Sequence, residues 1–123
     1  MSRIIIDSDI LIDSLRCKPS ARKLLIDIGV QHEAFCSAIS IGEVIAGMKM
    51  SEREETYKLL SSLRVIPVSF EIAERAGELK AEHKSHSLQL DDCLIAATSL
   101  LEGDFLCTRN KKHYPMHEIR FFD

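Results

Sequence analysis

The run Arg3-Ile4-Ile5-Ile6 near the N-terminus constrains the fold more than any other part of the chain. Consecutive β-branched residues without polar alternation are typical of a strand that is buried on both faces, and such strands belong to parallel sheets covered by helices. The run ends at Asp7, so we expect the strand to stop there. The sequence therefore predicts an α/β fold built around a parallel sheet.

The rest of the chain alternates between helical and strand patterns. Apolar residues spaced three and four apart predict helices at residues 19–29, 40–47, 51–63, 69–84 and 92–103. Short β-branched or aromatic runs predict further strands at residues 34–36, 65–68, 104–108 and 119–122. We therefore expect a three-layer α/β/α architecture with a parallel sheet of about five strands and right-handed crossovers.

Composition excludes several classes of protein. With 46% hydrophobic and 28% charged residues, the chain is too apolar to be disordered, and we expect one domain over residues 1–123. Its apolar runs are far shorter than the ~20 residues of a membrane span. A signal peptide needs an apolar run near the N-terminus, and in this chain that run is interrupted by Asp7, Asp9 and Asp13. These features predict a cytoplasmic protein with no membrane contact.

Neither the net charge nor the cysteines assign a ligand. The formal charge of −3 provides no overall basic surface, so a nucleic acid would have to be held by local patches or through a metal ion. Cys17, Cys36, Cys93 and Cys107 lie far apart and form no C-x-x-C motif. We therefore expect small buried side chains rather than a zinc site or a disulfide framework.

Four polar residues are expected to meet at one edge of the sheet. Asp7 follows the first strand, and Glu43 lies in the helix after the second. Asp92 begins the last long helix, and Asn110 follows the strand at residues 104–108. Ligands of parallel sheets bind at the carboxyl ends of the strands. Because neighbouring carboxylates repel one another and all the donors are oxygens, the set predicts a hard cation, Mg²⁺ or Mn²⁺.

Each of these residues also has a purely structural interpretation. Asp7 can cap the turn after the strand, and one of Asp91 and Asp92 can cap a helix. Glu43 stands three residues after a serine, as in a capping box, and Asn110 can hold a turn. The functional interpretation therefore depends on the joint placement of the residues and not on any one of them.

Basic residues flank the same edge of the predicted sheet. One group follows the first strand and the other lies in the loop after the strand at residues 104–108. Side chains of this kind hold the phosphates of a nucleic acid backbone. The residues that we expect to make such contacts with a nucleic acid are Arg16, Lys18, Arg22, Arg109 and Lys111.

Four segments of the chain, in this order, resemble the four motifs of PIN-domain ribonucleases. They are residues 4–12 (IIIDSDILI), 40–44 (SIGEV), 92–98 (DCLIAAT) and 108–110 (TRN). The resemblance spans nearly the whole chain. It is closest to the VapC type, the toxin half of prokaryotic toxin–antitoxin pairs. No single motif is decisive, but the ordered set is specific.

The resemblance implies a metal site with Asp7, Glu43 and Asp92 as its acidic ligands and Asn110 at the fourth motif. Four neighbouring residues are expected to support them: Ser8, Asp91, Thr108 and His113. PIN-domain ribonucleases often carry a further acid in the fourth motif or three positions beyond its asparagine. This chain has Asn110 and His113 at those two places. The lower charge predicts one ion as a minimum and leaves a second ion open.

The resemblance also implies a reaction and partners. The reaction is hydrolysis of RNA phosphodiester bonds by a water that the ion activates, leaving a 5′-phosphate. Asp7 and Asp92 would hold the ion, Glu43 would bind a second ion or orient the water, and Asn110 would position a ligand or a phosphate oxygen. A VapC-type protein would also form a homodimer and bind a cognate antitoxin that covers the acidic groove.

Two other classes of protein fit parts of the sequence. The D-x-D pattern of Asp7 and Asp9 resembles the start of haloacid-dehalogenase-like phosphatases, in which an aspartate attacks phosphate. No later lysine or second aspartate pair completes that pattern. The non-enzymatic alternatives are a catalytically degenerate PIN module that acts by partner binding and a receiver-like domain. The missing fourth acid keeps the degenerate module open, whereas the late position of Asp91 and Asp92 argues against a receiver.

Overall fold

A four-stranded parallel sheet forms the centre of the computed structural model, which describes all 123 residues. The strands are β1 (Arg3–Ile6), β2 (Glu33–Ser37), β3 (Arg64–Ile66) and β4 (Phe105–Cys107). Their spatial order is β3-β2-β1-β4, and every neighbouring pair is parallel. The first strand of the sequence therefore lies inside the sheet, as its uninterrupted isoleucines predict.

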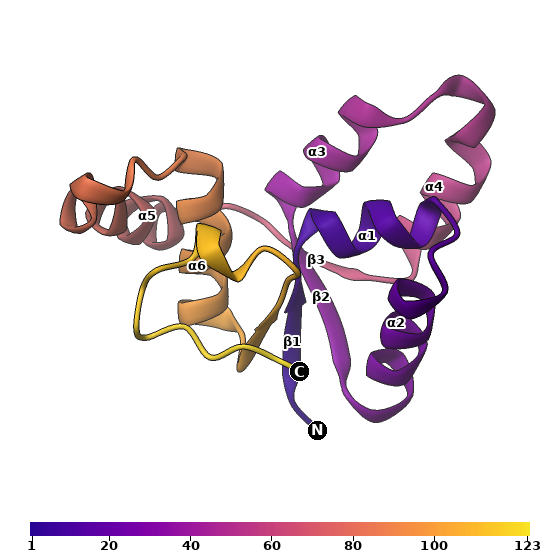
Figure 1. Ribbon diagram of the computed structural model, residues 1–123, viewed down its shortest axis with the longest axis horizontal. Helices are drawn as coiled ribbons and strands as arrows, with labels where there is room; N and C mark the ends of the chain where they lie inside the picture. Colours follow the sequence, from indigo (N-terminus) through magenta and orange to yellow (C-terminus); the bar gives the residue numbers. More distant parts are fainter.

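Helices cover both faces of this sheet (Figure 1). They are α1 (Ser8–Leu15), α2 (Pro19–Gln31), α3 (Ala38–Gly47), α4 (Arg53–Ser61), α5 (Phe70–Glu82) and α6 (Leu90–Glu102). Single 3₁₀ turns follow at η1 (Met50–Glu52), η2 (Lys84–His86) and η3 (Lys111–His113). In Figure 1, α1 to α4 lie on one side of the strands and α5 and α6 on the other. The predicted three-layer architecture is confirmed. None of the helices combines the length and the apolar character needed to cross a bilayer.

The isoleucines of β1 divide the core between the two faces of the sheet. Ile4, Ile5 and Ile6 have no exposed surface. Ile5 packs in a cluster with Ile95 of α6, whereas Ile4 and Ile6 pack in a second cluster with Ile10 of α1. Successive side chains of a strand point to opposite faces, so one short run anchors both helical layers. The end of β1 is therefore fixed in space.

The strand expected at residues 119–122 does not form, so the sheet has four strands rather than about five. Phe121 makes only an isolated parallel bridge with Leu106. A turn precedes it, in which the Ile119 N–H donates to the Met116 carbonyl at 3.2 Å. Because this turn uses the residues that would extend the pairing, the contact with β4 stays limited to one bridge.

One helix, α1, was not predicted from the sequence, and α3 begins earlier than predicted. Helix α1 starts directly after β1, and Asp7 is its N-cap, with Oδ1 accepting a hydrogen bond from the Ser8 N–H at 2.8 Å. Helix α3 starts at residue 38, because the hydroxyl of Ser37 caps it. Ser40 therefore lies inside α3, buried, and the expected capping box at Ser40 and Glu43 was wrong. Glu43 occupies the second turn of the helix, facing the sheet edge rather than the helix start.

The starts of α4 and α6 also differ from the predictions. Helix α4 begins at residue 53, after η1, where the Lys49 N–H donates to the Glu52 carboxylate at 2.6 Å. Helix α6 begins at residue 90 with Gln89 as its N-cap, so neither Asp91 nor Asp92 caps it. Both aspartates lie in the first turn, where negative charge stabilises a helix. A capping requirement therefore does not account for the aspartate pair.

The cysteines follow the prediction with one exception. Cys36, Cys93 and Cys107 are buried, and all four cysteines are free thiols. Cys17 is exposed, because it lies in the tight turn between α1 and α2 with a positive φ of 62°. No disulfide contributes to the fold.

Candidate active site

The candidate site lies where the strand order of the sheet reverses. The chain passes from β1 through β2 to β3 on one side and returns to β4 on the other side of β1. Asp7 immediately follows β1, and its N–H donates to the Cys107 carbonyl of β4 at 2.9 Å. Thr108 immediately follows β4. Crevices at such switch points are the usual ligand sites of parallel sheets.

Asp7 is held at both oxygens of its carboxylate. Only 5% of the residue is exposed. Oδ2 accepts hydrogen bonds from the Thr108 and Tyr114 hydroxyls, each at 2.8 Å. Oδ1 accepts the Ser8 N–H at 2.8 Å. Asp7 therefore acts as a helix cap and is also oriented at the sheet edge, so its structural and functional interpretations are compatible.

Glu43 and Asp92 reach the same edge from different helices. The Ser8 hydroxyl donates to Glu43 Oε1 at 3.0 Å, which joins the start of α1 to α3. Asp92 enters from the first turn of α6, and His113 Nδ1 lies 3.8 Å from Asp92 Oδ2. The three acidic residues named by the resemblance therefore gather around the end of β1, together with the supporting residues Ser8 and His113.

Burial and mutual repulsion raise the pKa values of these carboxyl groups. Burial, followed by the nearby Asp91 and Asp7, raises the pKa of Glu43 to about 7, although the Ser8 hydroxyl opposes the shift. Burial and the charge of Asp91 raise the pKa of Asp92 to about 6, against the effect of His113. Asp7 contributes to both shifts. The acids therefore lie close enough to disfavour simultaneous ionisation.

The donor chemistry of this cluster fits a hard divalent cation. Every acidic donor is an oxygen, and a cation would offset the repulsion between neighbouring carboxylates. No three His, Cys, Asp or Glu side chains lie close enough together to hold a metal ion by themselves. This arrangement suits an ion such as Mg²⁺, which uses one or two carboxylates and keeps several waters.

Asp9 is a site residue that the sequence analysis did not select. Its Oδ2 accepts hydrogen bonds from the Arg109 N–H at 2.9 Å and from the Asn110 side-chain amide at 3.1 Å. Burial, followed by the charge of Asp7, raises the pKa of Asp9. Asp9 thereby fixes the loop after β4, and the amide hydrogen of Asn110 is directed at Asp9. The two-residue spacing from Asp7 is the signal that could have identified it.

Tyr114 is the second residue that the sequence analysis missed. It is 2% exposed, and its hydroxyl bonds to an aspartate 107 positions earlier in the chain. Burial and the charge of Asp7 raise its pKa well above the usual range, so the hydroxyl keeps its proton and donates it to the hydrogen bond. No local motif marks this tyrosine, because only the tertiary fold brings it to Asp7.

Most of the basic residues expected to bind RNA make contacts within the protein. Lys18 lies 3.2 Å from Asp13, and Lys111 lies 2.7 Å from Asp123. The guanidinium of Arg109 hydrogen-bonds Ser20 at 2.8 Å, and Arg22 donates to a backbone carbonyl at 3.1 Å. These groups and Arg16 are all exposed. Contact with RNA therefore requires that phosphates compete with these neighbours, and it stays a prediction.

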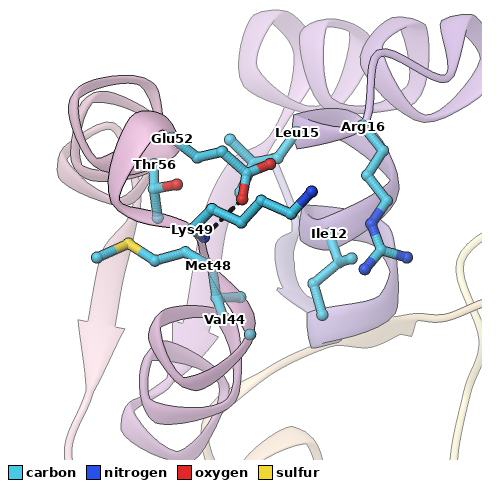
Figure 2. Close-up of a pocket in the computed structure, with 9 residues that line it drawn as sticks. Ile12, Leu15, Arg16, Val44, Met48, Lys49, Glu52 and Thr56 are labelled. Carbon is cyan, nitrogen blue, oxygen red and sulfur yellow. Dashed lines mark hydrogen bonds between the residues drawn. The ribbon is translucent and has the colours of Figure 1, made fainter.

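A cavity of about 370 Å³ opens between α1 and α3 (Figure 2). Its walls come from α1 and α3, the helices that also carry Ser8 and Glu43, and from η1 and α4. Ile12, Val44 and Met48 supply apolar surface, and Arg16 and Lys49 supply positive charge. Figure 2 shows both basic side chains extending toward the opening between the helices. Val44, which lines the cavity, follows Glu43 in α3, whereas no residue of the acidic cluster lines it.

Comparison with known proteins identifies the fold and the family. The family model described as PIN domain matches residues 4–118, which is nearly the whole chain. The chain belongs to the PIN-domain family. The site residues inferred from the sequence therefore occupy a PIN domain, and the phosphatase-like and receiver-like alternatives are not supported. The degenerate PIN module remains within the family.

Curated and solved PIN-domain relatives agree with this assignment. Ribonuclease VapC10 from Mycobacterium tuberculosis is 40% identical over 117 residues, covering 94% of this chain and 88% of the relative. A toxin–antitoxin complex from Klebsiella pneumoniae contains a chain that is 31% identical, with a TM-score of 0.80 and 94% coverage of both chains. DNA-bound VapBC from Salmonella typhimurium has a TM-score of 0.84 at 20% identity, covering 100% of this chain and 98% of that one, which shows a shared fold.

Proposed function

We propose that this PIN-domain protein is a metal-dependent endoribonuclease and the toxin of a VapBC-type toxin–antitoxin pair. The observation that carries the proposal is the gathering of Asp7, Glu43 and Asp92 at the switch point of the sheet, where burial and the neighbouring charges of Asp91 and Asp7 raise the pKa values of Glu43 and Asp92. The names of the 40% identical ribonuclease and of the 31% identical toxin–antitoxin complex support the same activity and partnership.

Each residue of the cluster has a defined task in this proposal. Asp7 and Asp92 would hold the divalent cation, Mg²⁺ or Mn²⁺, with one ion as a minimum. When bound, the cation would lower the pKa of water and stabilise the charge that develops on the phosphate. Glu43 would orient the attacking water or bind a second ion. Asn110 keeps the loop after β4 in place through Asp9.

The metal requirement can be tested directly on purified protein. We expect cleavage of single-stranded RNA in millimolar Mg²⁺ or Mn²⁺, loss of cleavage after treatment with EDTA, and recovery when the ion is restored. Gel analysis of a labelled RNA measures this, and calorimetry with the metal alone measures binding. A protein that binds neither ion and leaves RNA intact would instead be the degenerate PIN module, which the absence of a fourth acid at Asn110 and His113 would then explain.

The antitoxin is proposed to use the cavity between α1 and α3. The cavity combines apolar walls with the charges of Arg16, Lys49 and Glu52, two of them positive, which suits a peptide segment carrying apolar and acidic side chains. A second groove along α1, α2 and α4 shares Leu15 with it, so the suitable surface continues away from the cluster. Because Val44 of the cavity follows Glu43 in α3, a segment that extends from the cavity toward the start of α1 would cover the site and inhibit it.

A charge placed in the cavity should weaken inhibition without reducing activity. We expect Met48→Asp to lower the affinity for the antitoxin by roughly 10-fold or more, since its carboxylate offsets the positive charges of Arg16 and Lys49 and repels acidic side chains of the partner. The exposed Met50, outside the cavity, provides the matched control Met50→Asp. The test is RNA cleavage by each variant in the presence of the antitoxin encoded by a short reading frame beside this one. Equal inhibition of both variants would place the antitoxin elsewhere.

Two further parts of the proposal concern assembly and compartment. We propose a homodimer, which the resemblance to VapC-type proteins implies, and exposed apolar side chains on and after β3, namely Val65, Val68 and Phe70, offer surface for such contacts. We place the activity in the cytoplasm, where its RNA substrate occurs and where free thiols stay reduced.

A further inference from the structure

We propose that Tyr114 is a positioning residue that fixes which oxygen of Asp7 binds the metal ion. The inference rests on the proposed function, because it concerns the same cluster. Its basis is the hydrogen bond from the Tyr114 hydroxyl to Asp7 Oδ2 at 2.8 Å, within a region where both residues are buried.

The hydrogen bonds of Asp7 leave one oxygen position open. An ionised carboxylate offers about four lone-pair sites, two on each oxygen. Thr108 and Tyr114 occupy both sites of Oδ2, each at 2.8 Å. The Ser8 N–H occupies one site of Oδ1 at 2.8 Å. The Ser8 hydroxyl lies 3.4 Å from Oδ1 but only 3.0 Å from Glu43, so its single proton goes to Glu43. The remaining site of Oδ1 is therefore the position available to a cation.

The tyrosine ring is held firmly enough to direct its hydroxyl. Tyr114 belongs to the core cluster of Ile5 from β1 and Ile95 from α6, so packing fixes the ring on the side of the sheet that carries Asp92. A hydrogen bond also holds the turn that precedes Tyr114: the Tyr114 N–H donates to the Lys111 carbonyl at 2.9 Å. A donor on a rigid ring orients a metal-binding carboxylate more effectively than one on a mobile side chain.

This arrangement gives Tyr114 a different task from Thr108. The threonine hydroxyl also lies 3.4 Å from Asp9 and accepts the Asn110 N–H at 3.1 Å, so it connects Asp7 to the loop after β4. The tyrosine hydroxyl donates its hydrogen bond to Asp7 alone. Removing the Tyr114 hydroxyl therefore lets a cation also bind Oδ2 of Asp7, while the loop after β4 stays unchanged.

The test is metal binding by Tyr114→Phe, which keeps the packed ring and removes only the hydroxyl. We expect its affinity for Mg²⁺ and Mn²⁺, measured by calorimetry with the metal alone, to fall about 10- to 100-fold, the usual effect of losing a partner of a metal ligand. The chain has only one other tyrosine, Tyr57, which is exposed on α4, so Tyr57→Phe is the matched control and should bind as the unsubstituted protein does. Cleavage by Tyr114→Phe should recover at raised metal concentration.

A second measurement reports on Tyr114 itself. Because the chain lacks tryptophan, Tyr114 is the only strong near-ultraviolet fluorophore of the Tyr57→Phe protein. Titration with Mg²⁺ should change its emission in a saturable way, and Asp7→Asn should abolish that change. Equal metal affinities of Tyr114→Phe and Tyr57→Phe, with emission that does not respond to Mg²⁺, would overturn the inference. If the unsubstituted protein binds no metal at all, the proposed function fails instead.

Discussion

Replacing Asp7 by asparagine is expected to abolish RNA cleavage, with a fall in rate of at least about 10³-fold. A bound cation contributes several kcal/mol of transition-state stabilisation, and each 1.36 kcal/mol corresponds to about a factor of ten in rate. Asp7→Asn removes the negative charge that we expect to hold the cation most directly, since Asp7 is the only buried acid of the cluster. Initial rates on a labelled RNA, measured over a range of Mg²⁺ concentrations, test this.

The asparagine variant is expected to stay folded, which makes the result interpretable. Asparagine is as good a helix N-cap as aspartate, and its side-chain oxygen can still accept hydrogen bonds. Asp27→Asn on the exposed face of α2, where Asp27 pairs with Lys23, is a control of the same chemistry far from the cluster. Both variants should unfold cooperatively in urea. Undiminished cleavage by a folded Asp7→Asn protein would show that the catalytic groups lie elsewhere.

The metal-free protein is expected to become less stable as the pH rises, and Mg²⁺ should reverse this trend. The folded-state pKa of Glu43 is raised from 4.5 to about 7, and that of Asp92 from 3.8 to about 6. The folded protein therefore binds protons more tightly than the unfolded chain. That stabilisation is fully present below the unfolded pKa values and is lost as the pH rises through about 6 and about 7.

The free energy of unfolding should fall by on the order of 1–3 kcal/mol between about pH 5 and about pH 8 without metal, after allowance for partial solvent screening. Mg²⁺ binds the ionised carboxylates, so saturating Mg²⁺ should stabilise the protein at the higher pH, by about 2.7 kcal/mol at 100 times its Kd, and much less at the lower pH. Urea unfolding at both pH values measures this. Glu43→Gln should reduce the pH dependence, and a trend that is identical with and without Mg²⁺ would contradict a cation at this cluster.

The sequence predicted the central strand and the layered fold because that information is local. The uninterrupted isoleucine run that ends before Asp7 indicates a strand buried on both faces. Because Asp7 follows this strand directly, the position of the strand also determines the position of the first carboxylate. The helix boundaries were less accurate, because several residues compete to cap a helix. The Ser37 side chain caps α3 in place of Ser40, whereas α6 begins after Gln89 without a side-chain cap.

Contacts between distant residues could not be predicted from a single sequence. The ordered motifs identified Asp7, Glu43 and Asp92, whose roles as metal ligands remain a proposal. The partners that orient them come from elsewhere in the chain. Tyr114 reaches Asp7 across 107 positions, and the Asn110 amide reaches Asp9 across 101. Periodicity and spacing carry no information on such pairs, because folding alone determines which loop closes over which strand.

The link between Asp7 and Tyr114 has a consequence for when activity can arise during protein synthesis. Domains made on the ribosome emerge from their N-terminus, and contacts distant in sequence form last. A nascent polypeptide that has released Asp7 but not yet β4 or Tyr114 lacks the hydroxyls that orient its first carboxylate. The growing chain would therefore not cleave the messenger RNA from which it is translated. Cleavage activity would appear only once translation of the toxin is almost finished.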